Sequence, residues 1–193
     1  MNTARFPIHF IGAGPGAEDL ITERGAALLK EADVVVYAGS LVNPAHLKRC
    51  RPEAELHDSA RMNLKEQVEV MARGVLEGKK VVRLHTGDPS MYGAVAEQFD
   101  LLDKKGIESI VVPGVSSVFA AAAALRTELT YPGLAQSLVL TRTPGRTPMP
   151  SGEACEAFAK TGATLAFFLS AGKLDELAAR LVSAGKSPDT AAA

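Results

Sequence analysis

The fold is decided by a stretch near the middle of the chain that reads Lys80-Val-Val-Arg-Leu-His-Thr-Gly-Asp-Pro-Ser-Met-Tyr-Gly93. Its first residues, Lys80–Leu84, are mostly apolar and predict a buried strand. The chain then turns sharply through Gly87-Asp88-Pro89. After the turn, apolar residues at helical spacing predict a helix with an inner face made of Tyr92, Val95, Ala96, Phe99 and Leu102. A strand, a tight turn and a helix in this order are typical of one step of an α/β fold.

Asp88 lies where this strand would end, and two roles are open for it. Open α/β sheets bind ligands at the carboxyl ends of their strands, so the Asp88 carboxylate could accept from ribose hydroxyls or pair with a cationic ligand. Alternatively, Asp88 only caps the following helix, with Pro89 in its first turn. The loop by itself does not decide between these roles.

The same alternation of strand and helix extends in both directions from this stretch. Strands are predicted at Ile8–Ile11, Asp33–Tyr37, Glu53–Leu56 and Ile107–Val112, and helices at about Asp19–Glu31, from Asn63 onward and at Val115–Leu125. Asn63 with Glu66 three residues later is the pattern of a capping box. The alternation predicts an α/β fold whose parallel sheet carries helices on both faces.

This alternation stops around Tyr131-Pro-Gly133, and we place a domain boundary there. The interpretation is an N-terminal α/β domain at residues 1–131 and a smaller mixed α/β C-terminal domain at residues 132–193. The second domain has two predicted strands, Ser137–Thr141 and Ala163–Leu169, and a final amphipathic helix. Since two strands make only a marginal sheet, we expect this domain either to lean on a partner or to be truncated.

A glycine-rich loop, Gly12-Ala-Gly-Pro-Gly-Ala17, joins the first predicted strand to the first helix. It nominally fits G-x-G-x-x-A, so an NAD-binding oxidoreductase is a real alternative. Pro15 counts against it, because proline lacks the N–H that a pyrophosphate would need. The second strand also ends in Tyr37-Ala-Gly39 without the acidic residue that holds a ribose. A tight turn that binds no ligand is the third interpretation.

The composition argues against several other classes of protein. With 21 basic and 22 acidic residues the formal net charge is -1, without the basic excess that nucleic-acid binding usually shows. No apolar run approaches the ~20 residues of a membrane span, and the N-terminus lacks the apolar core of a signal peptide. We therefore expect a cytoplasmic protein that binds neither nucleic acid nor membrane. Cys50, Cys155 and the four histidines lack metal-ligand spacing, so no metal site is expected.

Three motifs stand in order along the chain: Gly12-Ala-Gly-Pro-Gly16, Arg83-Leu-His-Thr-Gly-Asp-Pro89 and Val112-Pro-Gly-Val-Ser-Ser117. Together they resemble the tetrapyrrole (corrin/porphyrin) methylases, from residue 8 to the end of the chain. Two more distinctive strings, Tyr37-Ala-Gly-Ser-Leu-Val42 and Leu140-Thr-Arg-Thr-Pro-Gly-Arg-Thr-Pro148, resemble the branch that methylates C11 of precorrin-4 in cobalamin (vitamin B12) biosynthesis. The alternatives are a methylase for another ring carbon or for cobalt-precorrin-4, and a non-catalytic tetrapyrrole carrier.

The resemblance implies an enzyme that binds S-adenosylmethionine in a cleft between two domains and releases S-adenosylhomocysteine. The residues that match the family's cofactor contacts are Pro15, Thr86, Gly87, Asp88, Met91, Ser116, Ser117 and Leu169. One further contact of the family lies beyond residue 193. Members of the family commonly form homodimers, and we expect the same here.

Candidate substrate contacts follow from the acetate and propionate groups of a tetrapyrrole, which make it polyanionic. Arg142 and Arg146, in the proline-rich loop, are suited to bidentate pairing with carboxylates; a solvated basic loop is the alternative. Weaker candidates are Gly12, Gly14, Asp58, Met62 and His85. No catalytic residue is assigned, because methyl transfer from a sulfonium depends mainly on orienting donor and acceptor.

Overall fold

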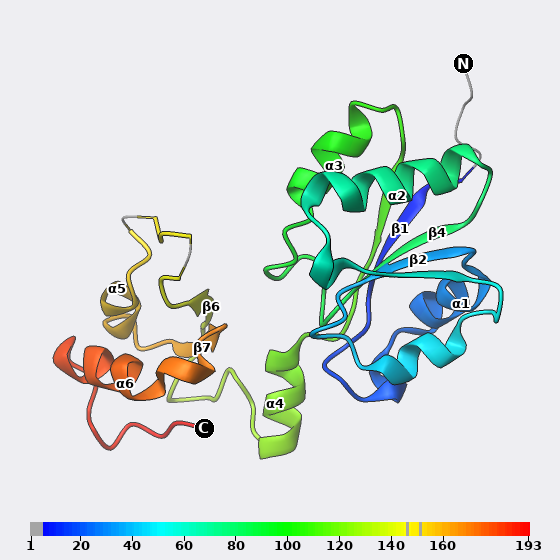
Figure 1. The fold of residues 1–193 in the computed structure, drawn as a ribbon. Coiled ribbons are helices and arrows are strands. Elements are labelled where there is room, and N and C mark those ends of the chain that lie inside the picture. Colours follow the sequence, from blue (N-terminus) through cyan, green and yellow to red (C-terminus); the bar gives the residue numbers. More distant parts are fainter. Residues whose placement is uncertain (1–5, 146, 151) are drawn as a thin grey trace. The chain divides into compact units, whose positions relative to one another are not determined.

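The fold of the computed structural model is drawn in Figure 1, and the structure describes residues 6–145, 147–150 and 152–193. The chain forms two compact units, which divide between Ala121 and Ala122, within helix α4 (Ser117–Leu125). The domain boundary that we predicted near residue 132 therefore lies a short way along the chain from this division.

A five-stranded, all-parallel sheet forms the centre of the first unit in the described residues, with the strand order β3-β2-β4-β1-β5. The strands are β1 (Ile8–Gly12), β2 (Val34–Tyr37), β3 (Glu55–Asp58), β4 (Val81–His85) and β5 (Ser109–Val112). The parallel sheet predicted from the alternation is confirmed, and the strands differ from the expectation only at their ends. Because β1 and β4 are central and adjacent, the glycine-rich loop and the loop after β4 leave the sheet side by side.

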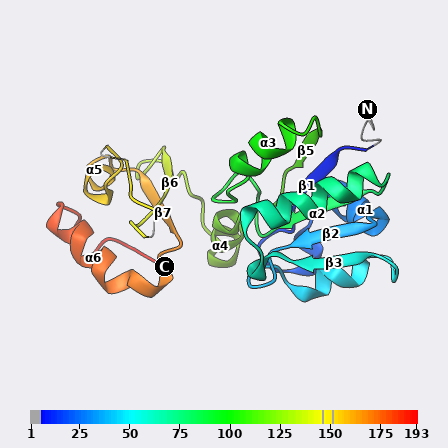
Figure 2. The same ribbon diagram turned by 45° about the horizontal axis from the view of Figure 1, so that its top comes forward.

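Helices cover both faces of this sheet, as Figures 1 and 2 show. The covering elements are α1 (Glu23–Glu31) and the 3₁₀ helix η2 (Pro44–Arg49) on one face, and α2 (Leu64–Leu76) and α3 (Ala96–Asp103) on the other. On the first face Leu29 packs with Val35 and Leu84. On the second, Met71 and Phe10 belong to a fully buried cluster. Burying both faces explains why the inner strand β2 is a continuous apolar run, Val34-Val-Val-Tyr37.

The starts of three helices show where local patterns were sufficient and where they were not. Asn63 and Glu66 form the predicted capping box at α2, with N–H···O distances of 3.1 and 2.8 Å. The helix predicted from Asp19 is wrong at its start: Thr22 caps α1 through the Gly25 N–H. Tyr92 does not belong to α3, because its φ of 55° is left-handed.

The second unit contains a parallel pair of strands, β6 (Leu138–Arg142) and β7 (Thr164–Phe168), in its described residues. They are accompanied by α5 (Cys155–Ala159) and α6 (Leu174–Ser183). Beyond the carboxyl ends of the two strands, the buried hydroxyls of Thr143 and Ser170 lie 3.0 Å apart in a hydrogen bond. The two predicted strands and the final helix are therefore present.

Three glycines meet at the carboxyl ends of β1, β4 and β5. A Cβ atom on Gly12 would lie 2.4 Å from the carbonyl oxygen of Gly87 and 2.6 Å from the Cα atom of Gly114. A Cβ atom on Gly114 would lie 2.1 Å from the same Gly87 oxygen. Since such distances are far below van der Waals contact, only glycine fits at these two positions. We call Gly12, Gly87 and Gly114 the glycine junction.

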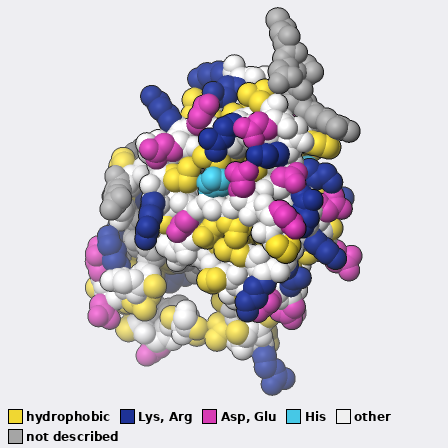
Figure 3. Space-filling view, turned by 45° about the vertical axis from the view of Figure 1, so that its right-hand side comes forward, with side chains coloured by type: hydrophobic (Ala, Val, Ile, Leu, Met, Phe, Trp, Pro, Cys, Tyr) yellow, Lys and Arg dark blue, Asp and Glu magenta, His cyan; other side chains and the backbone are white. Residues whose placement is uncertain are grey.

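The surface mixes charges of both signs. On the face drawn in Figure 3, basic and acidic side chains are interspersed, and pairs such as Lys80–Glu31 and Lys105–Glu69 connect neighbouring elements. Among the helices that the structure describes, none is long and apolar enough to cross a membrane.

The glycine junction yields a prediction about stability. Gly114→Ala should lower the free energy of unfolding by at least ~2 kcal/mol, because its methyl group overlaps backbone atoms that cannot move aside. Gly172→Ala is the matched control, since a Cβ there meets nothing within 4 Å and should change stability by about 0.5 kcal/mol or less. Urea unfolding of both variants measures this, and equal midpoints would contradict the predicted overlap.

Candidate functional site

The carboxyl edge of the first sheet brings two of the sequence motifs into direct contact. Gly14 and Gly87 exchange backbone hydrogen bonds, with N···O distances of 3.2 and 2.8 Å. The Ala13 N–H donates to the carbonyl of His85 at 2.7 Å. The glycine-rich loop is thus joined to the turn after β4, and both Gly14 and Gly87 need the left-handed φ values of 79° and 59° that they adopt.

Asp88 connects this pair of loops to the third motif. One carboxylate oxygen accepts the Ser90 N–H at 2.8 Å, and the other accepts the Gly114 N–H at 2.9 Å. Asp88 is not the cap of the following helix, since α3 begins only at Ala96. The carboxylate instead fixes its own turn and holds the turn after β5 against it. All three motifs are therefore assembled at one edge.

The third motif ends in a serine pair at the start of α4. The Ser116 carbonyl accepts the N–H of Phe119 at 3.1 Å, which begins the helix. The Ser116 side chain is 6% exposed, and its hydroxyl has no hydrogen-bond partner among the described residues. Buried hydroxyls without a partner are rare in proteins, and at the carboxyl edge this one is free to bond a ligand or a water molecule. Ser117, by contrast, is exposed.

The other predicted residues of this edge differ in their exposure. Thr86 is exposed, whereas Pro15 and Met91 are half-buried. Each belongs to the glycine-rich loop or to the turn after β4, so the structure places these three residues on the two loops that the Gly14–Gly87 pairing joins.

A second pair of loops follows β2 and β3, where Asp58 and Met62 were predicted. One Asp58 carboxylate oxygen accepts the N–H groups of Gly39 and Ala60, at 3.0 and 2.9 Å. The Met62 carbonyl accepts the side-chain amide of Gln67 at 3.0 Å. Both predicted residues therefore lie at the carboxyl edge of the sheet, and the Asp58 side chain ties the two loops together.

His85 lies inside the first unit. It is 5% exposed and stacks on Phe10, with 5.9 Å between the ring centroids. Burial, with the nearby charge of Arg83 adding to it, lowers the pKa of His85 to about 3. This placement keeps the imidazole neutral and does not favour direct contact with a substrate.

The second unit holds the remaining predicted residues. The Arg142 guanidinium donates to the carbonyls of its own loop, at Thr143, Thr147 and Pro148, over 3.1–3.2 Å. Leu169, at the carboxyl end of β7, is 76% exposed and has a left-handed φ of 57°. An exposed leucine in this conformation is unusual and marks a position under a special constraint. Arg146 lies outside the described residues.

Sequence reasoning missed the residues that organise these loops. Gly39 and Gly114 donate to the two aspartates, while Gln67 and Gln98 approach the Arg83 side chain from α2 and α3. A signal was available for the glutamines, since each interrupts the apolar stripe of its helix. Polar side chains on a buried stripe usually have a specific hydrogen-bond partner.

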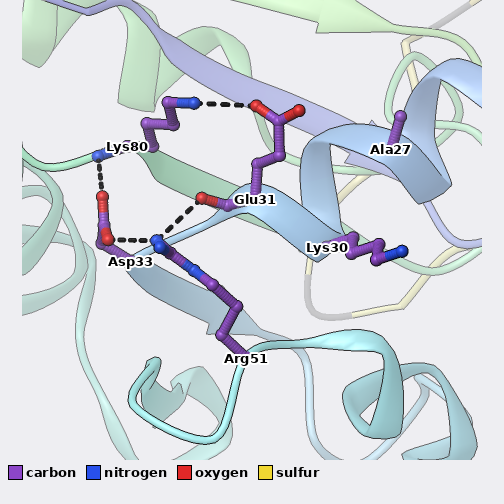
Figure 4. A pocket seen from close by; sticks show the side chains of 6 residues that line it. All are labelled: Ala27, Lys30, Glu31, Asp33, Arg51 and Lys80. Atoms are coloured by element: carbon purple, nitrogen blue, oxygen red, sulfur yellow. Dashed lines mark hydrogen bonds and ion pairs between the residues drawn. The ribbon is translucent and has the colours of Figure 1, made fainter.

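A hollow at the opposite, amino-terminal end of the strands is a competing candidate site (Figure 4). Four of its five charged groups already bind one another: Arg51 pairs with Asp33, and Lys80 pairs with Glu31 at 2.7 Å. The pairing with Lys80 lowers the pKa of Glu31. Since ligands of open α/β sheets bind at the carboxyl ends, we interpret these ion pairs as links between the end of α1 and the segments that lead into the strands.

The chain matches one protein family along most of its length. The model of the Tetrapyrrole (Corrin/Porphyrin) Methylases matches residues 7–193. A cobalt-precorrin-4 C(11)-methyltransferase of Methanocaldococcus jannaschii is 49% identical over 180 residues, 93% of this chain and 70% of that protein. A precorrin-4 C(11)-methyltransferase of Mycobacterium tuberculosis is 46% identical over 184 residues, 95% of this chain and 73% of that protein.

Solved structures agree with these relatives. The X-ray structure of a cobalamin biosynthetic enzyme, cobalt precorrin-4 methyltransferase, superimposes with a TM-score of 0.90 at 49% identity, covering 93% of this chain and 75% of that one. A uroporphyrin-III C-methyl transferase from Thermus thermophilus, complexed with S-adenyl homocysteine, gives a TM-score of 0.77 at 28% identity, covering 95% and 74%.

The buried His85 predicts a pH-dependent stability. Its folded pKa of about 3 lies below the usual 6.5, so the unfolded chain binds the proton more readily. Unfolding free energy should therefore be highest above about pH 6.5 and fall toward acid, with this residue contributing up to ~1.4 kcal/mol per pH unit.

His85→Phe keeps the stack on Phe10 and cannot titrate. Its denaturant midpoints, measured between about pH 7 and pH 4, should therefore fall less steeply than those of the parent chain. All other titrating groups are common to both proteins, so two parallel pH profiles would argue against a neutral buried imidazole.

Proposed function

The chain belongs to the tetrapyrrole methylases, and from this premise we propose that it transfers a methyl group from S-adenosylmethionine to C11 of precorrin-4 or its cobalt-containing form, in cobalamin biosynthesis. The observation that carries the proposal is identity of nearly one half to C11-methyltransferases, along more than nine-tenths of this chain. Such identity spans both units, so it includes the carboxyl edge of the first sheet and the ends of β6 and β7.

The cofactor site that we propose is the carboxyl edge of the first unit. Its residues are Pro15, Thr86, Gly87, Asp88, Met91, Ser116 and Ser117, and Leu169 stays a predicted cofactor contact from the sequence. The edge suits a polar ligand of this kind, because it offers the unpartnered hydroxyl of Ser116 and the first N–H groups of α4. In this proposal Asp88 acts by holding two turns in place, since both its oxygens accept backbone N–H groups.

Bound S-adenosylmethionine supplies an electrophilic methyl group on a sulfonium, and the macrocycle supplies the carbon nucleophile. On transfer the S–CH₃ bond would break as the C11–CH₃ bond forms, which would leave a neutral thioether, and the methylated macrocycle would release a proton to solvent. What the chain contributes is orientation, which is worth up to ~7–11 kcal/mol of a barrier. The glycine junction serves this purpose, because it fixes the three turns to one another without mobile side chains.

Substrate contacts are proposed at Gly12, Gly14, Asp58 and Met62 in the first unit and at Arg142 and Arg146 in the second. Arg142 already binds three carbonyls of its loop. These bonds hold its guanidinium in place, where its positive charge would attract a substrate carboxylate. His85 is left out of these contacts because of its burial.

A cytoplasmic homodimer is part of the same proposal. Cys50 and Cys155 are free thiols in the structure, which fits a reducing compartment. Phe119 and Leu125 of α4 are each 56% exposed, and exposed apolar side chains of this size suit a subunit interface. A single-chain mass in sedimentation would contradict the dimer.

The reaction itself is tested by incubating the chain with S-adenosylmethionine and either precorrin-4 or cobalt-precorrin-4. We expect S-adenosylhomocysteine together with a macrocycle that gains one methyl group at C11, located by NMR. A methyl group at another carbon would reassign the substrate position. A bound macrocycle without S-adenosylhomocysteine would indicate a carrier, and binding of NAD in place of S-adenosylmethionine would indicate an oxidoreductase.

Ser116→Ala tests the cofactor site. Removing one hydrogen bond to the ligand should weaken S-adenosylhomocysteine binding by about five- to tenfold, while the free protein keeps its stability because the hydroxyl has no partner there. Ser109→Ala is the matched control: its hydroxyl is also buried and unpartnered among the described residues, at the opposite end of β5. Calorimetric titration should separate the two variants, and equal dissociation constants would place the cofactor elsewhere.

A further inference from the structure

Arg83 is a buried charge for which the fold gives no ionic partner. Its side chain is 5% exposed, and no carboxylate pairs with it in the part of the chain that the structure describes. Burial lowers the pKa of Arg83 to about 10, so the guanidinium stays charged at neutral pH. Burying an unpaired charge is costly, and its retention in the core calls for a reason other than stability.

The guanidinium is surrounded by neutral oxygen atoms from four elements. One terminal nitrogen donates to the carbonyl of Val36 in β2 at 3.2 Å and to that of Leu84 in β4 at 3.5 Å. The other donates to the side-chain oxygen of Gln67 in α2 at 3.3 Å. The Nε atom donates to the side-chain oxygen of Gln98 in α3 at 3.4 Å.

Each glutamine also donates a hydrogen bond from its amide nitrogen to a backbone carbonyl near the carboxyl edge. The Gln67 amide nitrogen donates to the carbonyl of Met62 at 3.0 Å. The Gln98 amide nitrogen donates to the carbonyl of Ala94 at 3.1 Å. A continuous chain of hydrogen bonds, which we call the Gln67–Arg83–Gln98 bridge, therefore joins the loop after β3 to the segment that follows the turn after β4.

The segment at the second end of the bridge has a strained backbone. Tyr92 and Ala94 have left-handed φ values of 55° and 48°, and such residues cost about 1–3 kcal/mol each unless the surroundings hold them. The bond from Gln98 to the Ala94 carbonyl is one such restraint. Met91, a proposed cofactor contact, lies directly before this segment, and Met62, a proposed substrate contact, lies at the other end of the bridge.

We propose that Arg83 is a positioning residue for methyl transfer: through Gln67 and Gln98 it fixes the Met62 loop and the Met91–Ala94 segment relative to each other. What the two loops bind rests on the proposed function, whereas the bridge rests on the contacts of the first unit alone. The charge of Arg83 is suited to this task because one guanidinium donates in several directions from a rigid plane.

Gln67→Glu and Gln98→Glu separate positioning from stability. A glutamate keeps an oxygen for Arg83 and neutralises its charge, so the core stays bonded. It has no N–H for the loop carbonyl, so one end of the bridge is released. Stability should be retained in both variants, measured by urea unfolding, while each loses the restraint on a different loop.

The expected losses are specific to the loop that is released. Gln67→Glu should raise the KM for the tetrapyrrole about tenfold, the effect of one lost hydrogen bond to a positioned group, with the Kd of S-adenosylhomocysteine unchanged. Gln98→Glu should raise that Kd about tenfold and leave the tetrapyrrole KM less affected. Gln136→Glu, at an exposed glutamine outside the bridge, controls for the added charge and should change neither.

Hydrogen exchange gives a reading that needs no substrate. The Met62 N–H, which donates to Ser59, should exchange faster in Gln67→Glu only. The Met91 N–H, which donates to Asp88, should exchange faster in Gln98→Glu only. If one glutamate variant does not fold, the other still tests the bridge, because each variant releases a different loop.

Two results would overturn the proposal. One is unchanged exchange and unchanged affinities in variants that keep their stability. The other is an equal loss of both ligands that follows a loss of stability, because this is what a purely structural Arg83 predicts. If the parent chain produces no S-adenosylhomocysteine from either precorrin, the proposed function fails, while exchange and S-adenosylhomocysteine binding still test the bridge.

Discussion

Direct contact between backbone atoms at the glycine junction limits what the rest of the first unit can be. Gly12 and Gly114 approach the Gly87 carbonyl so closely that no side chain fits between them. The turns after β1, β4 and β5 are consequently held as one piece, and the Asp88 carboxylate adds a bond from the second turn to the third. The sheet order places these three strands side by side, so their turns start close enough to contact one another directly. A rigid edge of this kind is what a reaction governed by orientation requires.

Beneath this edge the core is organised around a polar group. Arg83 interrupts the apolar run of β4 and would destabilise a core that offered it only hydrocarbon. The two glutamines and the Val36 carbonyl satisfy its donors, and its field also helps to keep His85 neutral. The same stretch of β4 therefore carries a structural strand, a buried charge and, after His85, the turn of the proposed cofactor site.

In the second unit, too, a polar contact joins the loops that follow neighbouring strands. The hydroxyls of Thr143 and Ser170 join the chain beyond β6 to the chain beyond β7. Leu169 lies immediately before Ser170 with its side chain exposed, and Arg142 gathers the carbonyls of the proline-rich loop. In both units the predicted functional residues follow the carboxyl ends of parallel strands, where backbone groups that the sheet leaves unpaired need other partners.

The local sequence was sufficient to predict the alternation of elements, the parallel sheet, the capping box at Asn63 and the three motifs that mark the family, because each depends on neighbours within a few residues. It did not determine the partners of Asp88, since the Gly114 N–H is far away in the chain, nor the start of α3, where left-handed residues at Tyr92 and Ala94 override an apolar pattern. The burial of His85 and the bridge through Arg83 were likewise beyond it. These features arise from long-range packing, because they depend on which strands become neighbours. The order β3-β2-β4-β1-β5 brings β4 between β2 and β1, and local periodicity carries no information about that order.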